Sequence, residues 1–198
     1  MKGNARVRPL VVASLLALFA SSQANAQNSP IEWLLQFGAD FGGSKLGTVK
    51  FTNGDDVDVR ANDGILIGLG AAISNGADSP FKTQLTIGYK FGGPSAKNGD
   101  VTWSAIPIDV LEFYQISSVK IGGGIDYQMN PKLDVDVPGA KFVDKFENAL
   151  GYVLQIGWEP NRAYSVDLRY TAINYSLSAA PGSKIGGNVG GIYLAYRF

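Results

Sequence analysis

The chain has 198 residues, equal numbers of acidic and basic residues, and neither cysteine nor histidine. Without cysteine there are no disulfide bonds and no thiolate chemistry, and without histidine no imidazole serves as general base, metal ligand or pH switch. The length suits one sizeable domain, and the chain has no basic patch that would predict a nucleic-acid partner.

The first 26 residues have the layout of a cleaved secretory signal peptide. A basic start precedes an apolar run over 10–20 and the small-residue end Ala24-Asn25-Ala26. The run has about 11 residues against the roughly 20 of a spanning helix, so a permanent anchor is the lesser alternative. We expect cleavage after Ala26 and a mature domain over 27–198 with net negative charge.

Alternation of apolar residues with polar or small ones predicts strands along the rest of the chain. In FKTQLTIGYKF, the apolar Phe81 and Leu85 share one face and Lys82 lies on the other. This period of two is typical of strands whose two faces meet different surroundings. No amphipathic helix stands out. Eight such segments lie at 33–41, 64–73, 81–91, 101–114, 119–127, 150–158, 164–173 and 191–198.

The segment 101–114 is less regular than the others. Trp103 and Ala105 share one phase, the later apolar residues share the other, and Pro107 sits at the change. Because proline cannot donate a ladder hydrogen bond, we expect a bulge or edge irregularity near it. The faces of Asp109 and Glu112 stay open.

Long and short connections alternate between the predicted strands. A long first hairpin at about 43–63 and a long third loop at about 129–148 fall on one side of an antiparallel meander. The third loop mixes apolar residues with Asp and Lys.

The acidic part of the first long connection has two interpretations. Alternating residues run into Asn53-Gly54, a strong two-residue turn signal, and predict a solvated β-hairpin. The alternative is a calcium site, but the spacing lacks the Asp-x-Asp-x-Asp-Gly loop with a closing Glu. We favour the hairpin. The candidate calcium ligands would be Asp55, Asp56, Asp58 and Asp63.

A soluble sandwich and a membrane barrel place aromatic and charged residues differently. A sandwich keeps its apolar face in a core about 10 Å thick, whereas a barrel turns that face to lipid between aromatic girdles. Here aromatic residues such as Trp33 and Tyr196 lie near strand ends on the apolar face, and charges such as Arg169 lie at mid-strand on the other. We therefore predict an all-β fold: an eight-stranded antiparallel up-and-down transmembrane β-barrel.

The chain resembles the small outer-membrane β-barrels of Gram-negative bacteria, broadly those of the OmpA barrel, OmpX and OmpW. The resemblance rests on the signal peptide, the eight alternating strands, the long loops on one side and the final YRF. The resemblance covers essentially the whole mature chain. It implies an outer-membrane location, with the long first hairpin and the long third loop on the extracellular side. The third loop then fits a cap on the barrel mouth, a ligand-gripping loop, or a loop that touches lipopolysaccharide. The resemblance also implies that the barrel-assembly machinery reads the last strand as an assembly signal; lipid contact is the plainer role of the same face. The signal residues would be Ile192, Leu194, Tyr196 and Phe198.

The polar face predicts what fills the lumen. We expect a non-enzymatic, monomeric barrel with a structural or surface-interaction role, whose inward polar side chains pair with one another. A narrow passive channel or binder for small solutes is the alternative. Inward glycines such as Gly38 and Gly157 would give long side chains room or relax strand curvature. The predicted lumen network comprises Asp40, Lys82, Gln84, Lys90, Asp126, Gln155, Asp167, Arg169 and Arg197.

A lipid A-modifying enzyme is the third alternative. The related barrel enzymes use a serine with a histidine, and this chain has no histidine. Ser44 with Lys45, or Ser183 with Lys184, gives only a weak signal because neighbours in sequence point apart. We expect no catalytic residue, metal or cofactor, and we expect contacts with outer-membrane lipid and lipopolysaccharide.

Overall fold

The described part of the chain consists of strands and their connections. The computed structural model describes residues 31–50, 56–76, 79–96 and 99–198. None of these residues forms a helix long and apolar enough to cross a membrane. The predicted signal peptide and the Asn53-Gly54 turn lie outside them.

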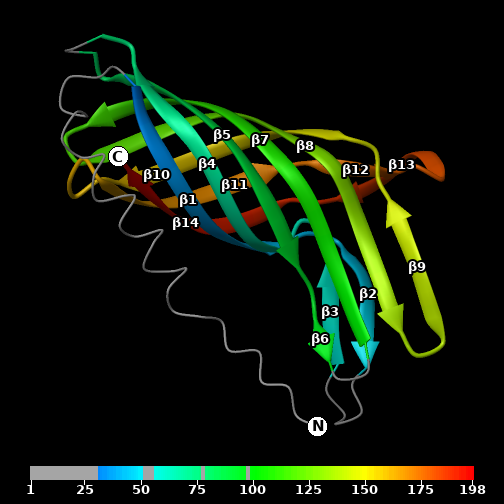
Figure 1. Cartoon of the computed structure of the whole chain (residues 1–198). Helices are drawn as coiled ribbons and strands as arrows, with labels where there is room; N and C mark the ends of the chain where they lie inside the picture. Colours follow the sequence, from blue (N-terminus) through cyan, green and yellow to red (C-terminus); the bar gives the residue numbers. More distant parts are fainter. Residues whose placement is uncertain (1–30, 51–55, 77–78, 97–98) are drawn as a thin grey trace, which may run out of the picture.

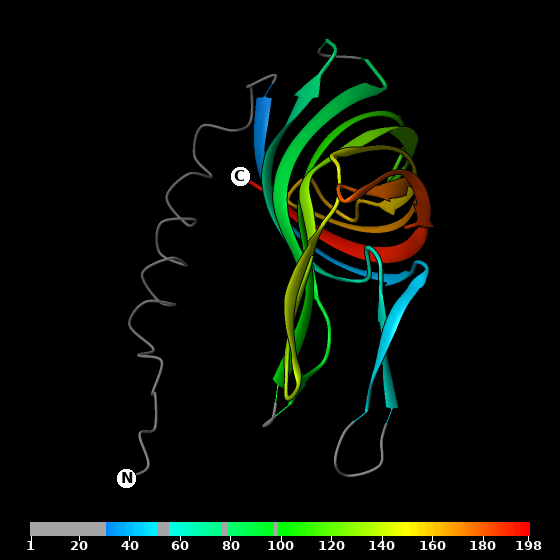
Figure 2. The same ribbon diagram turned by 90° about the vertical axis from the view of Figure 1, so that its right-hand side faces the viewer.

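Eight antiparallel strands close into a ring in the order β1, β4, β5, β7, β8, β10, β11, β14, because β14 pairs with β1 and β7 with β8. Figure 1 shows the strands tilted around one barrel, and Figure 2 shows the ring from a second side. The predicted eight-stranded fold is confirmed. The bounds are β1 (Ile31–Gly42), β4 (Gly64–Ser74), β5 (Phe81–Gly92), β7 (Gly99–Ile116), β8 (Val119–Val137), β10 (Ala149–Trp158), β11 (Tyr164–Ala172) and β14 (Val189–Arg197).

Shorter strands extend the connections at one end of the ring. The ribbon of β2 (Lys45–Lys50) and β3 (Asp56–Arg60) occupies the first long connection, as the hairpin interpretation predicts. In the third, β8 runs on to pair with β9 (Ala140–Lys145), so this segment is mostly strand. The remaining short strands are β6 (Ser95–Ala96), β12 (Asn174–Leu177) and β13 (Ala180–Gly186). We call this end, opposite the C-terminus in Figure 1, the loop end.

The barrel is apolar outside and polar inside. Trp33 and Leu154 are 61% and 68% exposed on the outer face, whereas Gln36 and Asp40 are buried inside. Single exposed apolar residues are ordinary in soluble proteins, but a continuous apolar exterior around buried charges is the pattern of a barrel solvated by lipid. The strand periodicity in the sequence therefore reflects lipid outside and a filled lumen inside.

The strand β7 keeps one phase throughout, contrary to the expected change at Pro107. Trp103, Ala105, Pro107 and Asp109 all point inward and are buried. The phase of the apolar residues changes because Trp103 points into an apolar interior at the loop end. The inward face of the strand stays the same along its length. Glu112 points outward.

The expected irregularity near the proline is present, but its extra residue lies on the partner strand. The register between β7 and β8 shifts between Ser104, opposite Lys132, and Ile106, opposite Met129. One residue on β7 therefore faces two on β8, and one of these, Asn130, has a φ of 50°. This is the geometry of a β-bulge, and asparagine tolerates the left-handed region better than most residues.

An apolar core lies at the loop end. Trp103, Phe146 and Tyr175 pack around one another with ring centroids 5.0 to 6.2 Å apart. Around them lie buried aliphatic residues from β3, β7 and β8, among them Val59 and Val101. Residues of the predicted third loop thus help to cover the barrel mouth, as the cap interpretation requires.

Candidate functional site

All nine predicted lumen residues point into the barrel. Eight of them are at most 4% exposed, and the side chain of Lys82, near the end of the barrel, is 24% exposed. Among the described residues the interior holds equal numbers of basic and acidic side chains, so the lumen has no net charge. The basic ones are Lys82, Lys90, Lys120, Arg169 and Arg197, and the acidic ones are Asp40, Asp109, Asp126, Glu159 and Asp167.

Asp40 is the centre of a first cluster. Nζ of Lys90 lies 2.5 Å from Oδ2 of Asp40, and the hydroxyl of Tyr193 donates to the same oxygen at 2.6 Å. Lys90 also donates to Oδ1 of Asn62 at 2.8 Å, and the Asn62 amide donates to the carbonyl oxygen of Gly187. These contacts connect β1, β5 and β14 with the turn before β4.

Gln128 joins this cluster to the apolar core. Its Nε2 donates to Oδ2 of Asp126 at 2.8 Å and to Oδ1 of Asn62 at 3.0 Å. The hydroxyl of Tyr175 donates to its Oε1 at 2.6 Å. The ring of Tyr175 therefore packs in the core while its polar end completes the lumen network, an arrangement typical of buried tyrosines.

Arg169 and Asp109 form a second cluster across the lumen. The guanidinium Nη2 lies 2.8 Å from Oδ2 of Asp109, to which the hydroxyl of Thr86 also donates at 2.8 Å. Nε of Arg169 donates to Gln155, and the guanidinium lies 4.6 Å from the centre of the Tyr193 ring. Buried ions need several such partners, because taking a charge out of water costs several kcal/mol.

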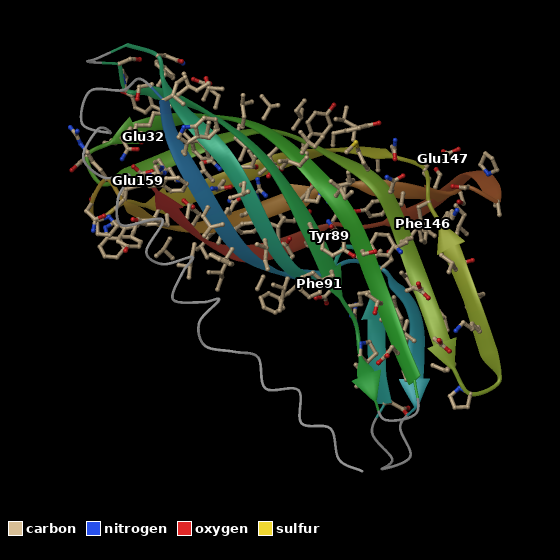
Figure 3. The ribbon with its side chains drawn as sticks, in the orientation of Figure 1. Glu32, Tyr89, Phe91, Phe146, Glu147 and Glu159 are labelled. Atoms are coloured by element: carbon tan, nitrogen blue, oxygen red, sulfur yellow. The ribbon has the colours of Figure 1, made fainter. Side chains whose placement is uncertain are left out.

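Glu159 holds a third cluster at the end opposite the loops, where Figure 3 labels it. Its carboxylate lies 2.5 Å from Arg197, 3.4 Å from Lys120 and 3.8 Å from Lys82. Lys120 also lies 3.0 Å from Asp167. One acidic side chain thus neutralises cations from three strands of the ring.

The sequence analysis missed several members of these clusters. Lys120 and Tyr193 already lay on the inward phase of their segments, so the periodicity could have identified them. Asn62 and Glu159 lie outside the ring strands, in turns for which a period of two makes no prediction. The structure also resolves the open face of Asp109, which points inward.

The proposed assembly residues lie on the outer face of the last strand and just beyond it. Ile192 and Leu194 are more than half exposed. Tyr196 stacks on Phe198 with a centroid distance of 6.0 Å and contacts Tyr164 of β11 at 5.1 Å. The backbone of Phe198 exchanges two hydrogen bonds with Trp33 of β1, so this residue also closes the ring.

One serine and lysine pair comes together that the sequence did not indicate. Nζ of Lys120 donates to Oγ of Ser165 at 3.3 Å, and Ser165 donates to Asp167. Both Lys120 and Ser165 are 1% exposed, so this hydroxyl is closed to solvent. Within the described part of the chain, no group of three or more acidic side chains is placed to hold a metal ion.

Comparison with solved structures defines the fold. Neisserial surface protein A aligns at 12% identity and a TM-score of 0.51 over 86% of this chain and 98% of its own. Ail, the attachment invasion locus protein of Yersinia pestis, aligns at 12% identity and a TM-score of 0.54 over 85% of this chain and 97% of its own. The fold is that of a small outer-membrane β-barrel.

The apolar exterior is the surface that a lipid bilayer solvates, in agreement with a location in the bacterial outer membrane. No protein-family model matches the sequence, and no curated protein matches it. Identity of 12% establishes the shared fold and not a shared function.

Proposed function

We propose that the protein is a monomeric, non-conducting outer-membrane barrel with a structural or surface-interaction role. The observation that carries this proposal is the cross-lumen pairing of Arg169 on β11 with Asp109 on β7, two strands that are not neighbours in the ring. With Arg169 4% and Asp109 2% exposed, water has almost no access to this level of the lumen. A small solute would have to break a buried ion pair in order to pass.

The other two clusters support the same proposal at different levels of the barrel. Lys90 with Asp40 connects β5 to β1, and Lys120 with Asp167 connects β8 to β11. Leu111, fully buried, belongs to a small apolar cluster inside the ring. Eight strands enclose a lumen that side chains just fill.

The chemistry of the interior supports a protein that is not an enzyme. Without histidine or cysteine, activation of a nucleophile would depend on lysine or carboxylates, and the Ser165–Lys120 pair is sealed from substrate. The interaction role would then lie with the extended hairpins at the loop end, since exposed loops on a rigid scaffold usually carry recognition. The outer face would contact lipid and lipopolysaccharide.

Conductance in planar bilayers tests the closed lumen. We expect the purified wild-type protein to insert without steady openings. The double variant Asp40→Ala/Lys90→Ala removes one cross-lumen pair without leaving a lone charge and should open intermittently, whereas the exposed pair variant Asp136→Ala/Lys141→Ala should stay closed. Steady openings of the wild-type protein would establish the narrow-channel alternative instead.

A further inference from the structure

Two extensions at the loop end enclose an apolar cleft. One wall is the β2–β3 ribbon and the other is the part of β7 and β8 that runs beyond the ring; Figure 2 shows them as two arms. The cleft has a volume of about 410 Å³. Leu46, Val49 and Val137 are among its aliphatic lining residues, and none of the lining residues that the structure describes is charged. Of the described lining residues, Thr48 alone has a polar side chain.

The floor of the cleft is part of the buried apolar core. Val59, Val101, Leu133 and Val135 line it and also belong to the buried core around Trp103, and each is at most 8% exposed. The register of the ribbon places Gly47 opposite Val59 and therefore on the same face. The space between the two walls is thus bounded by two sheet faces whose side chains point toward each other.

We propose that this cleft binds the alkyl chain of a free single-chain amphiphile. Its volume suits roughly 10 to 14 methylene groups if each takes about the 30 Å³ of a water molecule. A cleft of a few hundred Å³ with apolar walls and few polar groups is the usual form of a small-molecule site. The proposal goes beyond the closed barrel and does not depend on it, because the cleft lies outside the lumen.

The surroundings favour recognition of the chain over recognition of a charged head group. Lys45 lies 2.7 Å from Asp58, and Lys141 lies 2.6 Å from Asp136, so these cations on β2 and β9 already have partners. The exposed aromatic residues Tyr89 and Phe91 mark the loop-end edge of the apolar exterior (Figure 3), and the arms begin beyond it. Because the longer loops of outer-membrane barrels are extracellular, we assign the ligand to the medium outside the cell rather than to the bilayer.

Tryptophan quenching by a brominated chain tests the site directly. The chain has three tryptophans, and Trp33→Phe with Trp158→Phe leaves Trp103, which pairs with the lining residue Leu133. Undecanoic acid brominated at its terminal carbon, added to this protein in nanodiscs, should quench Trp103 saturably. Nanodiscs made with phospholipid brominated in its acyl chains should not quench it.

A filled cleft provides the matched comparison. Gly47 lines the cleft, and a Cβ added to it meets no atom within 4 Å, so Gly47→Leu begins its side chain in open space and adds bulk to the cleft. Gly190, on the outer face of β14, is equally open, and Gly190→Leu is the control. We expect Gly47→Leu to weaken binding of the brominated acid at least tenfold and Gly190→Leu to change it less than twofold. Binding should tighten by roughly fourfold per methylene until the cleft is full.

Each outcome of these experiments decides the proposal. The proposal is supported if the free acid quenches Trp103 saturably and Gly47→Leu abolishes this quenching. If the brominated phospholipid quenches Trp103 and Gly47→Leu abolishes that quenching, the assignment to a free amphiphile is overturned and a bilayer chain is the occupant. If neither reagent quenches Trp103, or if quenching is equal in both glycine variants, the alkyl site itself is overturned. This holds whatever the conductance measurements show for the lumen.

Discussion

At the scale of single residues, glycine decides whether the charged interior fits. A Cβ at Gly38 would lie 2.5 Å from the Tyr193 ring, so the ring lies over the glycine and reaches Asp40. We predict that Gly38→Val displaces Tyr193, breaks its bond to Asp40 and lowers the free energy of unfolding by about 2 to 4 kcal/mol. Urea titration of the refolded protein measures this. Gly190→Val, in open space on β14, should not lower the free energy of unfolding, because replacing a strand glycine reduces the backbone entropy lost on folding. Equal losses in both variants would contradict a specific effect of the Tyr193 contact.

At the scale of elements, β2 and β3 pair with each other in a sheet separate from the ring; Val59 reaches the apolar core, and polar residues such as Asp58 make cross-strand contacts within the ribbon. The hydrogen bond from Lys45 is the main cause that holds the pKa of Asp58 below its ordinary value, with Thr48 and Arg60 adding to it. Because the folded pKa is lowered, this contribution is present at neutral pH and is lost as the pH falls through that pKa. We predict that amide-exchange protection in the ribbon is flat between about pH 5 and 8 and falls only below about pH 4. Asp58→Asn should abolish the acid step; a step that persists in this variant contradicts the assignment.

At the scale of the whole molecule, the backbone of Phe198 closes the ring next to β14, and we propose that its aromatic ring has a separate task in recognition by the assembly machinery. Deleting the residue would remove both, including its two hydrogen bonds to Trp33. Phe198→Ala keeps the backbone, so we predict nearly normal refolding in detergent but several-fold lower levels in the outer membrane of cells, as seen in membrane fractions. Phe41→Ala, another outward aromatic, is the control and should leave the levels unchanged. Normal outer-membrane levels of Phe198→Ala would contradict the recognition role and leave lipid contact as the role of the outer face of the last strand.

Much of the fold followed from the sequence because a membrane barrel imposes one rule on every strand. With lipid on one face and a filled lumen on the other, the period of two persists from Trp33 to Phe198, and it placed Asp40, Lys90 and Arg169 on the inward side without any knowledge of pairing. The same rule failed in β7, where Trp103 faces an apolar core instead of the polar lumen. Periodicity reports which residues share a face, and it does not report what that face meets.

By itself the sequence determined the class of barrel and the inward set of residues, since both depend on local alternation along each strand. Only the tertiary structure decided which inward charges meet: Arg169 reaches Asp109 across 60 residues of chain, and Glu159 gathers cations from three strands. It alone also brought the ribbon and the β7–β8 extension face to face around an apolar cleft. Pairing of this kind depends on the ring order, strand tilt and bulges, which fix distances between residues remote in sequence and leave no periodic trace in it.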